Sequence, residues 1–348
     1  MRRGGEFQST GKTDRFLNPD ILSETRCSVW RLTVSQPRRN FTYVKVIKIS
    51  IDEKTGKFTD SFGNIAVLAP KNINRTTFPI FTMKKKVQSP SSIKTYKQCP
   101  RKYYYAYIMG LEQPPNIHTL RGNIAHSVLE HFFDIDTSFM TMDDYGPHLK
   151  LIMQQLLLKE WQHNKPKLDK LELTQAKHIH YFEETLMMLF NWLELFCKKL
   201  ENKEGKFQER FKQLTPMREL MFVSENYHAK GIIDAIEHNG DGTVRLMDYK
   251  TSASENLNEH LLQLGIYSLL YLDKHGVMPK QVGVYFLKGK EACIEVDEEL
   301  IEMAKREIAH IHSVTQTQDI NHYPKSPSPL CKYSTGQCPF YDVCRPFE

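Results

Sequence analysis

Residues 231–250 read GIIDAIEHNGDGTVRLMDYK, and this stretch decides the fold of the region around it. Residues 239–242 (NGDG) are a strong signal for a tight turn between two strands. The flanking segments, 228–237 and 243–251, are rich in residues that favour strands. The sequence therefore predicts a hairpin that carries carboxylates on both of its strands.

Three charged side chains of this hairpin are predicted to meet. Asp248 and Lys250 are two residues apart on one strand, so they project from the same face. Asp234 on the neighbouring strand can complete an oxygen-ligand site for a hard cation such as Mg²⁺ or Mn²⁺. The lysine is then placed to orient or deprotonate a water, as metal-assisted phosphodiester hydrolysis requires. An isolated Asp-x-Lys is far more often a solvated strand face, so other motifs must decide.

Two pairs of residues with helical spacing flank the hairpin. Gly122 and His126 lie four residues apart at the start of an apolar helical stretch. Gln263 and Tyr267 have the same spacing in a helix predicted over residues 257–273. Either pair alone indicates only packing between a helix and the core.

The four elements together resemble the RecB-like branch of the PD-(D/E)XK nuclease superfamily. Its motifs follow the order GxxxH on a helix, GxxD on a strand, DxK on the next strand and QxxxY on the following helix. The resemblance covers residues 89–348 and implies an α/β, restriction-endonuclease-like core. It also implies a metal-dependent DNA nuclease, in which a helical insertion narrows a channel for single-stranded DNA.

The resemblance assigns a role to each motif residue. It implies that His126, Asp234 and Asp248 bind Mg²⁺ or Mn²⁺, with the backbone carbonyl of Tyr249 as an additional ligand. A histidine ligand favours Mn²⁺, because imidazole suits softer ions than Mg²⁺. Lys250 is then expected to position the attacking water and to stabilise charge that develops on the phosphate.

Several further residues are candidates for supporting roles. Gln263 and Tyr267 are expected to orient the DNA strand or the metal-site residues. Glu219, on the preceding strand, is a candidate for a second metal or for a contact to the ligands. Tyr103 and Arg101 belong to a basic, tyrosine-rich segment, which either stacks on bases near the channel entrance or packs around Cys99.

The chain has seven cysteines, and four of them form a pattern. Cys331, Cys338 and Cys344 lie within fourteen residues bounded by Pro and Gly, which is typical of metal ligation on a loop. Cys99 is the best candidate for a fourth ligand, because it also precedes a proline. An odd number of cysteines, without a secretory leader, argues against a disulfide framework. Cys27, Cys197 and Cys293 are interpreted as ordinary buried or half-buried thiols.

Zinc and an iron–sulfur cluster both remain possible for these four thiols. Structural zinc is the commoner choice for four cysteines, although the paired CxxC knuckles of most zinc ribbons are missing. One cysteine before the first motif and three at the C-terminus resemble the iron–sulfur RecB-like nucleases, which include AddB and CRISPR-associated RecB-like nucleases. That resemblance implies a [4Fe-4S] cluster that ties the two ends of the domain together. The gap between Cys331 and Cys338 is longer than in many of those proteins.

Charge is unevenly distributed along the 348 residues. The composition, 40% hydrophobic and 25% charged, is typical of a soluble globular protein, and no apolar stretch is long enough to span a membrane. Residues 1–100 hold 19 Lys and Arg against 7 Asp and Glu, whereas the whole chain has a net charge of only +6. A basic N-terminal third suits a polyanionic substrate, or alternatively aids solubility.

Patterning divides the chain into three predicted parts. Residues 1–26 form a flexible basic tail, 27–86 a small β-rich unit with a linker, and 87–348 the nuclease domain. A helical insertion is expected over about residues 135–215, with a buried apolar stripe in a helix that begins near Gln175. The remaining elements are predicted strands at 28–34, 41–51, 64–68, 281–288 and up to 296, helices at 151–161 and 297–313, and a helix from Ser91 with that serine as its cap.

The sequence supports three functional hypotheses. The first is a single-stranded DNA exonuclease of repair or recombination, with an iron–sulfur cluster in a structural role. The second is a CRISPR-adaptation nuclease that trims spacer precursors, and the third a non-catalytic, metal-stapled DNA-binding protein. Expected partners are single-stranded DNA ends and a helicase or single-strand-binding protein, without a membrane. The expected location is the cytoplasm with the nucleoid, an organelle or nucleus remaining open.

Overall fold

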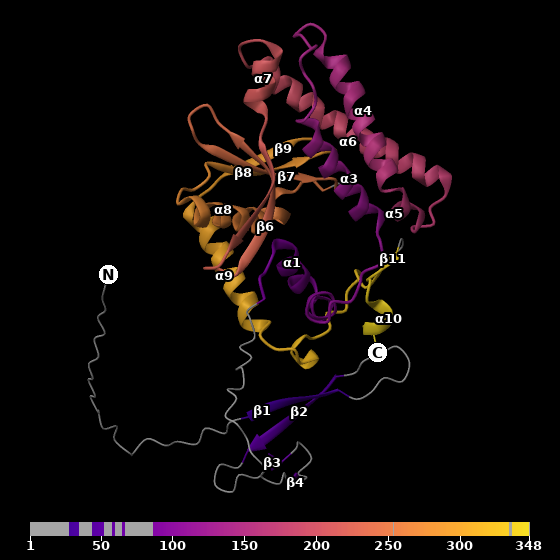
Figure 1. Cartoon of the computed structure of the whole chain (residues 1–348), viewed down its shortest axis with the longest axis vertical. Helices are drawn as coiled ribbons and strands as arrows, with labels where there is room; N and C mark the ends of the chain where they lie inside the picture. Colours follow the sequence, from indigo (N-terminus) through magenta and orange to yellow (C-terminus); the bar gives the residue numbers. More distant parts are fainter. Residues whose placement is uncertain are drawn as a thin grey trace, which may run out of the picture. The chain divides into compact units, whose positions relative to one another are not determined.

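Figure 1 shows the computed structural model, which describes four short strands before residue 86 and residues 86–252, 254–333 and 336–347. The chain divides into two compact units, Met1–Thr82 and Met83–Glu348. The predicted boundary between residues 86 and 87 stays a prediction.

The first unit contains an antiparallel sheet with the strand order β1-β2-β3-β4. Strand pairing aligns Ser28 with Ser50 and Val34 with Val44. The predicted strand at 28–34 is confirmed, whereas residues 41–43 of the next prediction and Cys27 lie outside the described residues. The strands are β1 (Ser28–Val34), β2 (Val44–Ile51), β3 (Phe58–Thr59) and β4 (Ile65–Ala66).

A five-stranded mixed sheet forms the centre of the second unit, with the order β5-β6-β7-β8-β9 (Figure 1). β7 and β8 are parallel, and the other neighbours are antiparallel. A parallel pair needs a crossover connection, which α8 supplies here. The predicted hairpin is β6 and β7. The strands are β5 (Met217–Ser224), β6 (Ala229–His238), β7 (Val244–Lys250), β8 (Gln281–Phe286) and β9 (Glu291–Glu295).

Helices cover both faces of this sheet, so the unit has the predicted α/β, restriction-endonuclease-like fold. α8 and α9 pack on one face, and we call the buried residues there the α8–α9 cluster. α3, α4, α6 and α7 bury their apolar sides in a second group, the insertion-side cluster. The helices are α1 (Pro90–Gln98), α2 (Pro100–Tyr103), α3 (Ile117–Phe132), α4 (Tyr145–His163), α5 (Lys165–Asp169), α6 (Gln175–Glu201), α7 (Phe207–Leu214), α8 (Leu261–His275), α9 (Glu298–Val314) and α10 (Tyr341–Cys344).

Helix periodicity in the sequence predicted α6, α8 and α9 and the part of α4 over residues 151–161. The helix expected over 257–273 is a 3₁₀ turn, Leu257–His260, followed directly by α8. The apolar stripe of α6 is buried through Leu189, Leu193 and Phe196, as expected from the periodicity. No helix in the described part of the chain combines the length and the apolar character needed to cross a membrane.

The start of α1 differs from the prediction. Ser89, not Ser91, caps the helix: its hydroxyl accepts from the Ser92 N–H at 3.2 Å, and the Ser92 hydroxyl accepts from the Ser89 N–H at 2.8 Å. The predicted cap was wrong because proline suits the first helical position, so the helix begins at Pro90, before Ser91. The residue before this cap, Gln88, is also held in place, because its backbone forms hydrogen bonds with His228 and with Lys230 of β6.

Candidate active site

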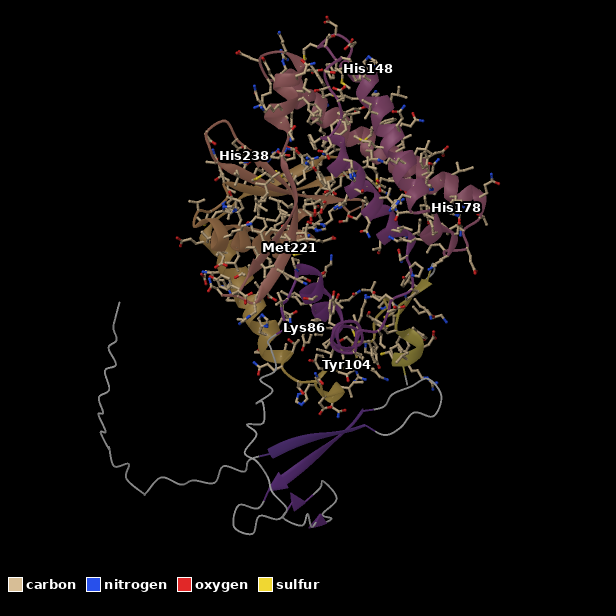
Figure 2. The ribbon with its side chains drawn as sticks, viewed as in Figure 1. Lys86, Tyr104, His148, His178, Met221 and His238 are labelled. Carbon is tan, nitrogen blue, oxygen red and sulfur yellow. The ribbon has the colours of Figure 1, made fainter. Side chains whose placement is uncertain are left out.

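The four motifs line one cleft of about 910 Å³ in the second unit. β5, β6 and β7 supply one side of it, α1 the other, and α8 and His126 of α3 complete it. Figure 2 labels Met221 of β5, which lines this cleft together with residues of α1. The cleft contains all the residues predicted to bind metal or to assist catalysis through their side chains: His126, Glu219, Asp234, Asp248, Lys250, Gln263 and Tyr267.

Three of these side chains form a compact group of potential ligands. His126 Nδ1 lies 3.4 Å from Asp234 Oδ2 and 3.7 Å from Glu219 Oε1. One ligand atom from each of the three lies within 4.8 Å of the other two. His126 Nε2 lies 3.0 Å from the backbone carbonyl oxygen of Tyr249. The sequence indicated only a supporting role for Glu219, but its carboxylate lies within this group of ligands beside the histidine.

A break in strand alternation brings Glu219 and Asp234 together. Their neighbours pair across the strands, Arg218 with Ala235 and Leu220 with Ile233, while Glu219 has a left-handed φ of 47°. Ile233 belongs to the α8–α9 cluster, whereas Ala235, two residues later, belongs to the insertion-side cluster. An uninterrupted strand would put both on one face. The strands therefore change faces at this pair, which directs both carboxylates into the cleft.

The Asp-x-Lys strand is connected to α8 by a short hydrogen-bond network. Gln263 Nε2 donates to Asp248 Oδ1 and to the Tyr267 hydroxyl, each at 2.7 Å. Lys250 Nζ lies 2.5 Å from the other oxygen of Asp248. The Tyr249 N–H donates to Asp234 Oδ2 at 2.7 Å. The QxxxY motif thus holds Asp248 in place.

The close contacts around Gly231 explain why the GxxD motif needs a glycine at this position. A Cβ at this position would lie 3.0 Å from Tyr267 Cε1 and 3.2 Å from Leu270 Cδ1. The glycine therefore lets α8 approach β6 closely enough for Tyr267 to reach the cleft. A Cβ at Gly122 would make only an ordinary contact, 3.6 Å from the hydroxyl oxygen of Thr251.

Charges in the cleft shift the pKa values of His126 and Asp234. Burial alone would lower the pKa of His126, but the neighbouring carboxylates of Asp234 and Glu219 outweigh it and raise the pKa to about 10. Burial, together with the charge of Asp248, raises the pKa of Asp234. The carboxylates are thus packed closely enough to repel one another, and a positive charge among them relieves that repulsion.

The residues present fit a divalent cation. One oxygen of Glu219 is buried without a hydrogen-bond partner among the described residues, and Asp248 Oδ2 is buried with only the ammonium group of Lys250 beside it. Unpartnered buried carboxylate oxygens are costly in the absence of a cation. One imidazole nitrogen with several carboxylate oxygens is a donor set that suits Mn²⁺ or Mg²⁺.

Tyr103 and Arg101 lie away from the cleft. Tyr103 is 0% exposed, its hydroxyl accepts from Gln88 Nε2 at 2.9 Å, and its ring stacks on that of Tyr323. Arg101 Nε donates to the Tyr323 carbonyl oxygen at 2.7 Å. Of the two roles open from the sequence, packing is the one available to Tyr103, since a fully buried ring offers no face to a base.

The four patterned cysteines line a second pocket. Cys99 follows α1, and Cys331, Cys338 and Cys344 come from the C-terminal segment. All four are half-buried and free of disulfides. Burial and the neighbouring Cys99 raise the pKa of the Cys344 thiol. Cys197 and Cys293 are also half-buried free thiols.

Sequence reasoning missed several residues that line the cleft. His260 is buried with an unpartnered Nε2, and its only sequence signal is a position one helical turn before Gln263. Lys94 of α1 could have been found from its three-residue spacing to Ser91. Met221 and Ile232 gave no signal, because an apolar residue on a strand is expected to be buried.

The chain is similar in sequence to known proteins. The sequence profile of the PD-(D/E)XK nuclease superfamily matches residues 88–345. This chain belongs to that superfamily, and the RecB-like nuclease predicted from the order of the motifs is confirmed.

Two individual proteins resemble the chain. The CRISPR-associated exonuclease Cas4 of Francisella tularensis subsp. novicida (strain U112) is 28% identical over 175 residues, which cover 48% of this chain and 86% of that protein. A crystal structure from Eubacterium rectale, assigned provisionally as an exonuclease, matches with a TM-score of 0.44 and 14% identity. The match covers 79% of this chain and 93% of the Eubacterium rectale chain, and no argument is based on so distant a likeness.

Proposed function

We propose that this nuclease is a metal-dependent exonuclease that hydrolyses single-stranded DNA in repair or recombination. One observation carries the proposal: His126, Glu219 and Asp234 place ligand atoms within 4.8 Å of one another, next to Lys250. His126, Asp234 and Asp248 are the proposed metal ligands, with Glu219 joining them. A divalent cation bound there supplies Lewis-acid activation of the phosphate and of an attacking water.

The chain's own residues supply the remaining chemistry. Lys250 is the ammonium group next to Asp248, and it is placed to orient the attacking water and to stabilise negative charge on the phosphate. Gln263 fixes Asp248 through one hydrogen bond, so the carboxylate is preorganised before substrate arrives. Tyr267 anchors Gln263 and acts as a positioning residue. The Tyr249 carbonyl remains a proposed further ligand.

The lysines of the cleft support a nucleic-acid substrate. Lys94 and Lys97 of α1, Lys230 of β6 and Lys250 of β7 all line the cleft, although Lys97 also pairs with Glu307 and Lys250 with Asp248. Positive charge on both walls suits a phosphate backbone. The basic first hundred residues are proposed to add to this attraction.

An iron–sulfur cluster is the proposed occupant of the cysteine pocket. The four thiols line one pocket, which joins the end of α1 to the C-terminal segment. One cysteine before the nuclease motifs and three at the C-terminus resemble the arrangement of the iron–sulfur RecB-like nucleases, which supports a cluster.

A second candidate function is the trimming of spacer precursors in CRISPR adaptation. The similarity to a CRISPR-associated exonuclease, which extends over 86% of that protein, favours it. Both candidates predict the same active site. They differ in substrate, because a trimming nuclease acts on overhangs of a partial duplex.

End-labelled DNA tests the proposal directly. Single strands, blunt duplexes and duplexes with overhangs are incubated with Mn²⁺, Mg²⁺ or EDTA. We expect stepwise shortening of single strands with either metal and none with EDTA. Shortening confined to overhangs would favour spacer trimming, and no cleavage of any substrate with either metal would refute both functions.

A further inference from the structure

The cleft floor beside the metal ligands is apolar and exposed. β5 and β6 pair Met221 with Ile232, one step along the strands from Glu219 and Asp234. Met221 is 58% exposed and Ile232 43% exposed. Two residues along a strand span about 7 Å, so this pair lies immediately next to the metal ligands. We call Met221 and Ile232 the apolar floor.

The kink in the strands accounts for this exposure. Phe222 and Ile233 point to the opposite face, where the α8–α9 cluster buries them. Beyond the kink, the insertion-side cluster buries Ala235 on the face that continues from the cleft. The apolar floor is the part of that face that the helical insertion leaves open. Its side chains are therefore available to a ligand that enters the cleft.

The charges around the floor identify the kind of ligand. Lys94 stands on the α1 wall together with Lys97, which pairs with Glu307 at 2.8 Å, and Lys230 lies two residues before Ile232 on β6. A ligand that is both polyanionic and apolar matches this arrangement. A single strand of DNA has a charged backbone and flat apolar bases, whereas the bases of a duplex are already stacked and paired.

We infer that Met221 and Ile232 bind the unpaired base of the nucleotide next to the scissile phosphate. This inference rests on the proposed function, because it assumes that the cleft holds DNA. The methionine thioether makes favourable contacts with aromatic rings, and both side chains gain from being removed from water. The floor thereby selects unpaired nucleotides, since a paired base cannot lie flat on the sheet.

The test compares two double variants. Met221→Thr with Ile232→Thr removes the floor, and threonine keeps the strand propensity of both positions. Val277→Thr with Met278→Thr is the matched control, because these residues are 59% and 44% exposed. They lie between α8 and β8, close to Lys280, whose N–H donates to Val244 at the opposite end of β7 from Lys250. Circular dichroism and melting curves check that each variant is folded.

The substrates are an end-labelled single-stranded oligonucleotide and the same oligonucleotide with abasic residues at its ends, both with Mn²⁺. We expect the parent and the control to prefer the base-bearing strand by about tenfold, through KM. The floor variant should lose that preference through a higher KM for the base-bearing strand. A folded, active floor variant that keeps the parent's preference would refute base binding by the apolar floor. That result would favour a protein partner as the ligand of this patch. A parent that cleaves neither strand would instead refute the proposed function and the floor with it.

Discussion

Asp248 and Lys250 share one face of β7, and the proposed chemistry depends on both. We predict that Asp248→Asn and Lys250→Met each lower kcat on single-stranded DNA by at least about 10³-fold with Mn²⁺. DNA binding, measured by fluorescence anisotropy, should stay nearly intact, because the lost interactions belong to the transition state. Lys280→Met is the control, since this lysine pairs with Asp241 away from the cleft. An Asp248 or Lys250 variant as active as the parent would contradict the site.

Glu219 is expected to be a metal ligand. Its unpartnered oxygen lies 3.7 Å from His126 Nδ1, within the proposed ligand group. Glu219→Gln keeps the shape and the backbone strain but removes the charge. We predict that calorimetry shows Mn²⁺ binding at least about tenfold weaker. Glu225→Gln, in the exposed turn after β5, should bind Mn²⁺ as the parent does; equal affinities for all three proteins would exclude Glu219 as a ligand.

The sequence predicted some site residues better than others, for a physical reason. Asp248 and Lys250 are two residues apart on one strand, so local geometry already places them on one face. Glu219 and Asp234 reach the site only through a left-handed φ at Glu219 and a change of strand face, which no spacing encodes. Tertiary packing, not composition, decides that a tyrosine in a basic segment is buried.

Close packing between α8 and β6 depends on Gly231. We predict that Gly231→Ala destabilises the protein by about 1–3 kcal/mol, because the new methyl group meets Tyr267 and Leu270. Cleavage should fall as well, since Tyr267 shifts with α8. Gly240→Ala in the β6–β7 turn is the control, as its Cβ would meet nothing within 4 Å. Urea unfolding measures both, and equal midpoints would show that α8 accommodates the methyl group.

A charge network joins α6 to the sheet and predicts a pH dependence. Burial alone would raise the pKa of Glu291, but Lys199 at 2.7 Å and Arg245 at 3.1 Å outweigh it, and the pKa is lowered. A lowered folded-state pKa stabilises the protein above the usual glutamate value of about 4.3, and this stabilisation is lost as the pH falls below it. Glu291→Gln should therefore be less stable than the parent at pH 7.

Urea unfolding at several pH values checks this sign. The gap between the parent and Glu291→Gln should narrow as the pH falls from 7 to about 3.5, because the parent then loses the same charge. Glu295→Gln, on the same strand but exposed, is the control. A gap that stays constant down to the lowest pH would show that the network does not depend on the ionised carboxylate.

At the level of elements, the sequence predicted helices and strands because their periodicity is local. The cap of α1 was misplaced by two residues, since a serine at either position satisfies the same pattern. The break in β5 and β6 was not foreseen at all. Alternating residues predict an unbroken strand, and only the packing of helices on both faces shows where the alternation changes.

The cysteine pocket ties the start of the nuclease unit to its end. Arg101 strengthens that tie, because it donates to backbone carbonyls near Tyr323. We predict that protein purified without oxygen is brown, and that Cys99→Ser bleaches it and lowers the melting temperature by at least about 5 °C. Cys293→Ser, outside the pocket, should keep the colour. A colourless parent with one equivalent of zinc and no iron would refute the cluster but leave the nuclease site intact.

The kink at Glu219 also affects how the whole molecule behaves at high concentration. β5 is an outer strand of its sheet, and it carries exposed Met221 and Val223. A straight outer strand with such side chains invites another chain to add itself by backbone hydrogen bonds, which leads to aggregation. The left-handed backbone at Glu219 interrupts β5 and places a carboxylate in its middle. The shape that we propose to serve catalysis is thus also expected to protect the protein from edge-to-edge association.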